Sequence, residues 1–164
     1  MTPEGALVET VRFTAVHAAR YPDDATSGPW LVTGAVLMTQ QAAALALRSA
    51  GDAIPAQVGA TELLLRAASK DRLPPPFTLP FGAAARQSFD RLVEARNAFA
   101  HPRGTVWFIS SDTLQRSLPV AAATVRHLIL VQPVLDNLIA PEDQRAVQDH
   151  LDAIEALAEF LSAD

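Results

Sequence analysis

Apolar residues recur along most of this chain three or four positions apart, the spacing of an amphipathic α-helix. The first such pattern covers residues 3–20, where Thr2 provides an N-cap and Pro3 suits the first helical turn. One face of this predicted helix is formed by Leu7, Val11, Thr14 or Ala15, and Ala18. We expect this face to pack against a core.

Prolines and glycines mark the ends of the next predicted elements. A long apolar helix over 30–49 ends ahead of Gly51, and a shorter helix follows over 58–70. Residues 71–82 hold four of the twelve prolines, so we expect an extended loop there. A further helix is expected over 83–100.

The last third of the chain contains two more predicted helices. Residues 105–110 alternate weakly and suggest a short strand-like segment. One helix is expected to follow Pro119 and run to about residue 138, with a kink at Pro133. The last helix begins at Pro141, and its apolar ladder is Val147, Leu151, Ile154, Ala158 and Leu161. Together the patterns predict an all-α fold, a bundle of five to six helices forming one domain over residues 1–164.

Residues 30–47 contain no charged side chain, a composition that is also typical of a membrane span. Polar residues stand near the middle of this segment, including the adjacent amides Gln40 and Gln41, which a membrane span would avoid. We interpret it as a core helix. The first twelve residues lack the basic and apolar regions of a signal peptide, and the chain has no cysteine. We therefore expect a soluble, cytoplasmic protein without a membrane partner.

Composition excludes several kinds of chemistry. Without cysteine there is no disulfide scaffold and no Cys-ligated zinc. The sequence has no dinucleotide, phosphate-loop, zinc-protease or serine-hydrolase motif, and its four histidines lack metal-ligand spacing. We expect no metal and no other cofactor.

The formal charge of −5 hides an uneven distribution. Between Arg66 and Arg103, seven basic residues face three acidic ones, a net of +4. Residues 136–164 hold eight acidic residues against Arg145, a net of −7. Twelve of the thirteen basic residues are arginine, whose forked donors suit carboxylates and phosphates. Overall acidity argues against non-specific duplex binding but leaves room for a local basic groove.

One group of residues in the basic segment has the composition of a reactive site. Arg96 and Asn97 are followed by His101, and Pro102 ends the helix predicted over 83–100. At 100° per residue, Arg96 falls in the middle of the apolar stripe of that helix. An arginine in that position is costly unless it has a partner or faces a groove.

Arg96, Asn97 and His101 resemble the RNxxxH motif of HEPN domains, an all-helical family that includes many metal-independent RNases of toxin–antitoxin and defence systems. The sequence pattern RNxFAH is also similar to that of the mannitol-operon-repressor family, whose members are regarded as transcriptional regulators. The resemblance covers six residues and the helical architecture. Arg103 stands two residues after His101, where many toxin members carry a tyrosine.

The resemblance implies a mechanism for RNA cleavage. The RNA 2′-OH would attack, His101 would act as general acid or base, and Arg96 would stabilise the phosphoryl oxygens. Asn97 would orient His101 or bind the sugar-phosphate, while Arg103 and Arg91 could hold flanking phosphates. Arg96 and His101 are about 140° apart around a helix, so a homodimer through the helix at 83–100 would complete the site.

Two other interpretations stay open at the level of sequence. The same fold could be a non-catalytic, HEPN-like or repressor-like module that binds RNA, an antitoxin or a regulatory protein. Alternatively, the chain is an unrelated helical bundle. In that case Arg96 would pair with a buried acid such as Asp136, Asn97 would satisfy the helix end and His101 would cap the last carbonyls.

Overall fold

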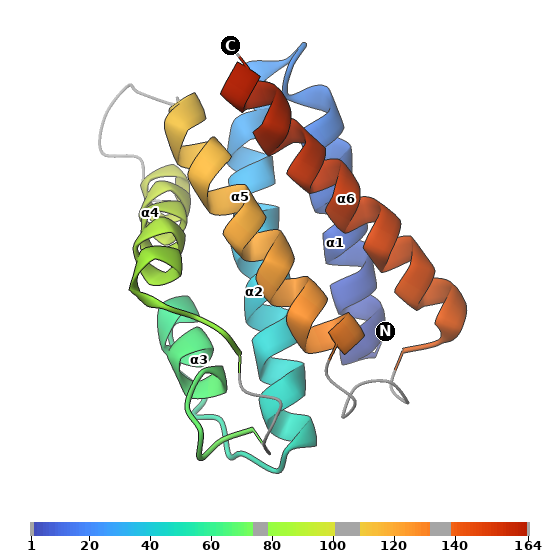
Figure 1. The fold of residues 1–164 in the computed structure, drawn as a ribbon, viewed down its shortest axis with the longest axis vertical. Coiled ribbons are helices and arrows are strands. Elements are labelled where there is room, and N and C mark those ends of the chain that lie inside the picture. Colours follow the sequence, from blue (N-terminus) through green and yellow to red (C-terminus); the bar gives the residue numbers. More distant parts are fainter. Residues whose placement is uncertain (1, 74–78, 101–108, 132–138, 164) are drawn as a thin grey trace.

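The computed structural model of the chain describes residues 2–73, 79–100, 109–131 and 139–163, and within these ranges the fold is an all-α bundle without strands (Figure 1). This confirms the predicted fold class. The α-helices are α1 (Pro3–Arg20), α2 (Gly28–Ser49), α3 (Ala60–Ala67), α4 (Ala83–Ala100), α5 (Ser111–Arg126) and α6 (Pro141–Ala163). A short 3₁₀ turn, η1 (Ala25–Ser27), precedes α2, and a π-helical segment, η2 (His127–Val131), continues α5.

Local signals placed the first two helices correctly. The Thr2 hydroxyl accepts a hydrogen bond from the backbone N–H of Gly5 at 3.1 Å, which is the predicted N-cap of α1. The predicted inward face of α1 is buried throughout. Helix α2 begins at Gly28, two residues before the predicted start, and ends at Ser49. Gly51 follows with a φ of +81°, a conformation that favours glycine after a helix end.

The predictions for α4 and α6 are confirmed, and the prediction for α3 is too long. Helix α4 covers residues 83–100 as expected, and α6 begins at Pro141 with the predicted ladder buried from Val147 to Ala158. Helix α3 covers only eight residues instead of 58–70, because Gly59 caps its start and the chain turns after Ala67.

The predicted start of the fifth helix is wrong. Helix α5 begins at Ser111, and Pro119 lies inside it. The Ser110 hydroxyl accepts a hydrogen bond from the backbone N–H of Thr113 at 3.2 Å and caps the helix nine residues before Pro119. Burial of apolar residues on both sides of Pro119, such as Leu114 and Ala121, offsets the hydrogen bond that proline cannot make.

Two expectations concern segments outside the described residues. The strand-like segment 105–110 is described only at its last two residues, which are not in a strand. The kink at Pro133 lies outside the described ranges, as does the central part of the proline-rich loop at 74–78.

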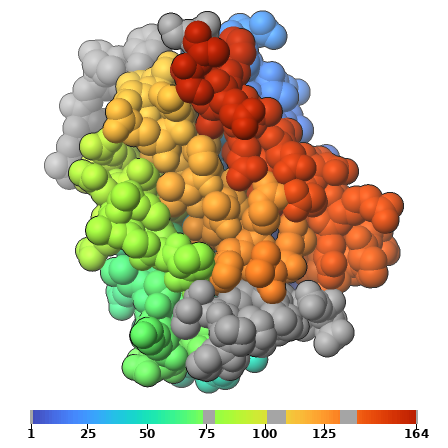
Figure 2. Space-filling model, viewed as in Figure 1, coloured from blue at the N-terminus to red at the C-terminus, as the bar shows by residue number. Residues whose placement is uncertain are grey.

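Four helices form a ring around the core. Helix α1 packs against α2 and α6, while α5 packs against α2 and α6 from the other side. Helix α4 lies outside this ring against α5 and α2, and α3 packs against α2 beside it. In Figure 2, α4, α5 and α6 form much of the face toward the viewer. The buried apolar residues belong to one core cluster that all six α-helices share.

Helix α2 is the central element of the bundle. Together η1 and α2 cover Ala25–Ser49, and an 18-residue window of this stretch is apolar enough to cross a membrane, with a mean hydropathy of 1.4. However, 67% of that window is buried inside the bundle, so its apolar composition is accounted for by core packing. Among the described residues, this is the one helix with that length and composition.

Gly34 allows α1 and α2 to approach closely, and Gly34→Ala is expected to destabilise the protein. A Cβ at this position would collide with the Thr14 hydroxyl and lie 3.2 Å from a ring carbon of Phe13. The Thr14 hydroxyl is fixed by donating to the carbonyl of Thr10 at 2.7 Å. We expect a loss of ~1–3 kcal/mol in the free energy of unfolding, where an unobstructed helical Gly→Ala gains ~1 kcal/mol.

Urea denaturation of Gly34→Ala, Thr14→Ala and the double variant measures this effect. Because Thr14→Ala removes the obstructing hydroxyl, the double variant should be more stable than the sum of the single effects predicts. Additive losses would contradict the assigned contact.

Candidate functional site

Helix α4, which carries the predicted motif, is anchored to the bundle through its middle. Phe89 and Leu92 are fully buried, and the Ser117 hydroxyl of α5 donates to the carbonyl of Ser88 at 2.7 Å. Phe89 also meets Phe81, just before α4, edge-on with ring centroids 6.3 Å apart. These contacts fix the rotation of α4 and therefore the direction of its other side chains.

Arg96 lies on the core-facing side of α4, as the periodicity predicts. It follows Phe89 and Leu92 at helical spacing, and Phe99 continues the same side one turn later. Arg96 is half-buried, and its Nε is buried without a hydrogen-bond partner. It forms no ion pair with the acidic side chains of the described residues. A buried donor without an acceptor costs free energy, so the Nε of Arg96 contributes no stabilising polar contact to the fold.

The other predicted site residues are placed only in part. Asn97 is exposed and Arg91 is half-buried on α4. His101 and Arg103 lie outside the described residues. So does Asp136, the acid that would pair with Arg96 if the chain were an unrelated helical bundle. Arg91 and Arg96 are five residues apart, about 140° around the helix, so their side chains leave α4 in different directions.

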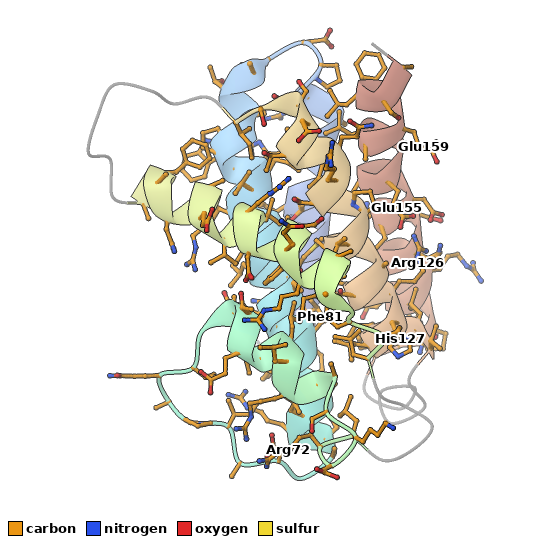
Figure 3. All side chains as sticks on the ribbon, turned by 60° about the vertical axis from the view of Figure 1, so that its left-hand side comes forward. Arg72, Phe81, Arg126, His127, Glu155 and Glu159 are labelled. Carbon is orange, nitrogen blue, oxygen red and sulfur yellow. The ribbon has the colours of Figure 1, made fainter. Side chains whose placement is uncertain are left out.

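Ion pairing distinguishes two kinds of arginine in the basic segment. Arg66 and Arg72 both bind the carboxylate of Asp52, at 2.8 and 2.9 Å, on the loop after α2. Arg72 marks this end of the molecule in Figure 3. Arg86 lies 3.6 Å from Asp90, one turn along α4. Within the described part of this segment, Arg91 and Arg96 are the arginines without an ion pair.

This pairing corrects the charge argument. The net of +4 was counted along the sequence, but Asp52 lies outside the counted segment and pairs with two of its arginines, so it offsets one of their two positive charges. The described arginines of this segment that lack an ion pair, Arg91 and Arg96, both lie on α4. Sequence reasoning missed Asp52 because no local pattern links it to arginines 14 and 20 residues further on.

The acidic last helix also has a structural role. Arg126 of α5 binds both Asp152 and Glu155 of α6, at 3.0 and 2.6 Å (Figure 3). These contacts join α5 to α6 at the side of the molecule away from α4. Part of the negative charge of the last helix thus pairs with a partly buried arginine across the contact between α5 and α6.

The structure places His17, one of the four histidines without metal-ligand spacing, in an aromatic cluster. Its ring is 4.5 Å from that of Phe13 and 6.4 Å from that of Trp30, between centroids. Nδ1 is buried without a hydrogen-bond partner. Burial lowers the pKa of His17 below its ordinary 6.5, and the nearby Arg20 charge lowers it further, with Asp24 acting in the opposite direction.

The lowered pKa of His17 predicts a loss of stability on acidification. Above pH 6.5 the ring is neutral in both the folded and the unfolded chain, so it has no effect on stability there. As the pH falls below 6.5, the unfolded chain binds the proton first, and the folded state loses stability until its own ring titrates. Urea midpoints from pH 7.5 to 5 should therefore fall more steeply for the wild-type protein than for His17→Gln. Parallel profiles would contradict the assignment.

Among the described residues, no three His, Asp or Glu side chains are arranged to hold a metal ion. The hollow beside the motif helix is shallow and lies on the outer side of α4, where Arg86, Asp90, Arg91 and Glu94 line it. This part of α4 carries a half-buried guanidinium without an ion pair among the described residues, next to the exposed amide of Asn97.

The fold and the placement of Arg96 define a helical bundle with an unpartnered cation on the core side of one outer helix. No protein-family model, curated protein or solved structure matches the chain.

Proposed function

We propose that the protein is a metal-independent endoribonuclease of the HEPN type, acting at a site completed by a homodimer. The observation that carries the proposal is the state of Arg96, which sits on the packed side of α4 with a buried Nε and no partner. A guanidinium kept in this state loses hydration without gaining an ion pair. It is suited to binding an anion that arrives with a ligand.

Phosphate is the anion that fits the surrounding chemistry. Arg96 would donate through its fork to the non-bridging oxygens of a phosphodiester and stabilise the charge that builds up during attack by the 2′-OH. His101, five residues on, would take the proton from the 2′-OH or give one to the leaving 5′ oxygen. Asn97 would hold the imidazole or the sugar, and Arg91 and Arg103 would hold phosphates on either side.

A second copy of α4 would complete the proposed site. Because Arg96 and His101 are separated by about 140° if the helical geometry continues, one chain directs them to different places. A two-fold axis beside α4 would bring Arg96 of one copy to His101 of the other, and it would form two equivalent sites. The proposed setting is cytoplasmic, with RNA and a regulatory partner such as an antitoxin as binding partners.

Cleavage of a labelled single-stranded RNA of random sequence, in the presence of EDTA, tests the proposal. The wild-type protein should cut it and leave 2′,3′-cyclic phosphate ends, and His101→Ala should lower the rate at least ~100-fold. His150→Ala, which alters a half-buried histidine of α6, is the matched control and should cut at the wild-type rate. Equal rates for wild type and His101→Ala would refute the mechanism.

A non-catalytic regulator would use the same residues differently. It would bind RNA or a protein through Arg96 and leave RNA intact in the cleavage assay. The two functions are separated by measuring RNA binding of the same variants: binding that depends on Arg96 without any cleavage identifies the regulator.

A further inference from the structure

The open side of α2 is uncharged over most of its length. Between Trp30 and Arg48, the residues that are not fully buried are Trp30, Thr33, Leu37, Gln40, Gln41, Ala44 and Arg48. Their spacing of three and four positions places them on one stripe along the helix. The solvent-facing stripe of a helix normally carries charged side chains. Here the first charged residue after Trp30 is Arg48, at the far end of the stripe.

Two hollows follow this stripe from one end to the other. The first encloses about 630 Å³ between α1 and α2. Four of the seven exposed large hydrophobic side chains of the described residues line it: Phe13, Val16, Trp30 and Leu37. The second encloses about 330 Å³ and reaches Arg48. Because the two hollows share Leu37 and Gln41, they form one continuous track, and its volume is in the range of ligand pockets.

The polar side chains of the first hollow are already engaged within the chain. The hydroxyls of Thr10 and Thr33 each donate to a carbonyl of their own helix at 2.8 Å. Glu9 and Arg12 form an exposed ion pair with each other. A polar ligand would lose hydration here without gaining matching hydrogen bonds, so this part of the track suits hydrocarbon.

The other end of the track carries a positive charge. Arg48 is the one charged residue among the described residues that line the second hollow. It is exposed, and it forms no ion pair with the acidic side chains of the described residues. Pro3, the first residue of α1, lines the same hollow, while Glu4 does not, so the positive end of that helix dipole lies on the same side as the cation. This end is therefore suited to an anion.

We propose that the track binds a long-chain fatty acid, with its carboxylate at Arg48 and its methyl end beside Trp30. The apolar part from Trp30 to Gln41 covers eleven residues, or ~16.5 Å. One layer of a bilayer's hydrocarbon core is ~15 Å thick, which is about the length of one such chain. An apolar course that ends at a single unpaired cation complements a molecule with a hydrocarbon chain and one anionic head.

This site is independent of the proposed ribonuclease site. It is lined by residues of α1, α2 and α3 and by none of α4, which carries Arg96 and Asn97. Failure of RNA cleavage therefore does not affect this inference. Failure of fatty-acid binding likewise leaves the proposed RNA chemistry unchanged.

The first test measures the charge of the head group by equilibrium dialysis of radiolabelled tetradecanoate below its micelle concentration. The wild-type chain should bind one molecule with a dissociation constant in the micromolar range. Arg48→Gln should raise that constant at least ~3-fold for tetradecanoate and leave it unchanged for the uncharged tetradecanol. Arg145→Gln is the matched control, since Arg145 is also exposed and forms no ion pair among the described residues.

The second test places a charge in the middle of the track. Leu37 is 42% exposed and lines both hollows, whereas Leu65 is 38% exposed on α3 and lines neither. Leu37→Glu should raise the dissociation constants of tetradecanoate and tetradecanol at least ~10-fold, because the chain would have to desolvate a carboxylate. Leu65→Glu should bind both as the wild type does. Thermal melts check that each variant is folded.

The third test fixes the direction of the bound chain through the fluorescence of Trp30. Trp107, which lies outside the described residues, is replaced by phenylalanine so that Trp30 is the single tryptophan. Bromine quenches an indole that it contacts. At equal occupancy, 14-bromotetradecanoate should quench Trp30 at least ~2-fold more than 2-bromotetradecanoate, whose bromine lies next to the carboxylate.

Several results would overturn the inference. One is the absence of tetradecanoate binding, and another is an equal effect of Arg48→Gln on the acid and the alcohol. Stronger quenching by the 2-bromo isomer would rule out the proposed direction. A chain that sediments with phosphatidylglycerol vesicles but does not bind monomeric tetradecanoate would make the face a membrane contact. A mass that rises with concentration in the wild type but not in Leu37→Glu, without fatty-acid binding, would make it a self-association surface.

Discussion

Arg96→Ala is expected to lower RNA cleavage by ~100–1000-fold while leaving the folded protein nearly as stable as the wild type. The loss of rate follows from removing the donor that stabilises charge on the phosphoryl group. Stability should change by less than ~1 kcal/mol, because the buried Nε has no partner and its removal breaks no ion pair among the described residues. The measurements are initial cleavage rates in EDTA and urea denaturation of the same samples.

Measuring both the cleavage rate and the stability of Arg96→Ala distinguishes a catalytic role of Arg96 from a structural one. If Arg96 instead held the fold through a buried ion pair, its removal would cost ~3–5 kcal/mol. Arg116→Ala is the control, since Arg116 is exposed on α5 and pairs with Asp112 at 2.7 Å. That variant should keep both its cleavage rate and its stability. A large loss of stability in Arg96→Ala with an unchanged cleavage rate would contradict the assignment.

Phe89→Ala is expected to have the largest effect on stability, a loss of ~3–5 kcal/mol in the free energy of unfolding. Phe89 is fully buried where α4 meets the bundle, and it also packs against Phe81. Removing the ring leaves a cavity beneath the helix that carries the proposed site. Because this loss approaches the total stability of many domains, the variant should be largely unfolded at 37 °C.

Phe160→Ala is the matched control for this substitution. Phe160 lies on α6 and is 50% exposed, so its removal should cost less than ~1 kcal/mol. Both variants are measured by urea denaturation followed by circular dichroism. Similar midpoints for the two variants would show that α4 is not anchored through Phe89.

Most of the fold could be predicted because its signals are local. The pair Thr2–Pro3 specifies the start of α1 within two residues, and the ladder that begins at Val147 specifies the buried side of α6. The start of α5 could not be found in this way. Pro119 has a strong local rule against helix interiors, and only the tertiary burial of neighbours such as Leu118 shows that the rule is outweighed.

Only those features of the candidate site that depend on α4 alone could be predicted from the sequence. Periodicity alone placed Arg96 on the packed side of α4, since the neighbours of a helical residue follow from its phase. The availability of each arginine was not predictable. Asp52 binds Arg66 and Arg72 from a different part of the chain, and such a contact follows from tertiary structure. The contacts of His17 with the rings of Phe13 and Trp30 likewise follow from tertiary structure, because Trp30 belongs to a different helix.

The most direct test of the central claim is cleavage of two matched oligonucleotides by the wild-type protein in EDTA. One is RNA, and the other has the same sequence with 2′-deoxyribose throughout. In-line attack by the 2′-OH requires that group, so the RNA should be cut to products with 2′,3′-cyclic phosphate ends and the deoxy strand should stay intact. Cleavage of both strands, or of neither, would contradict the proposed ribonuclease.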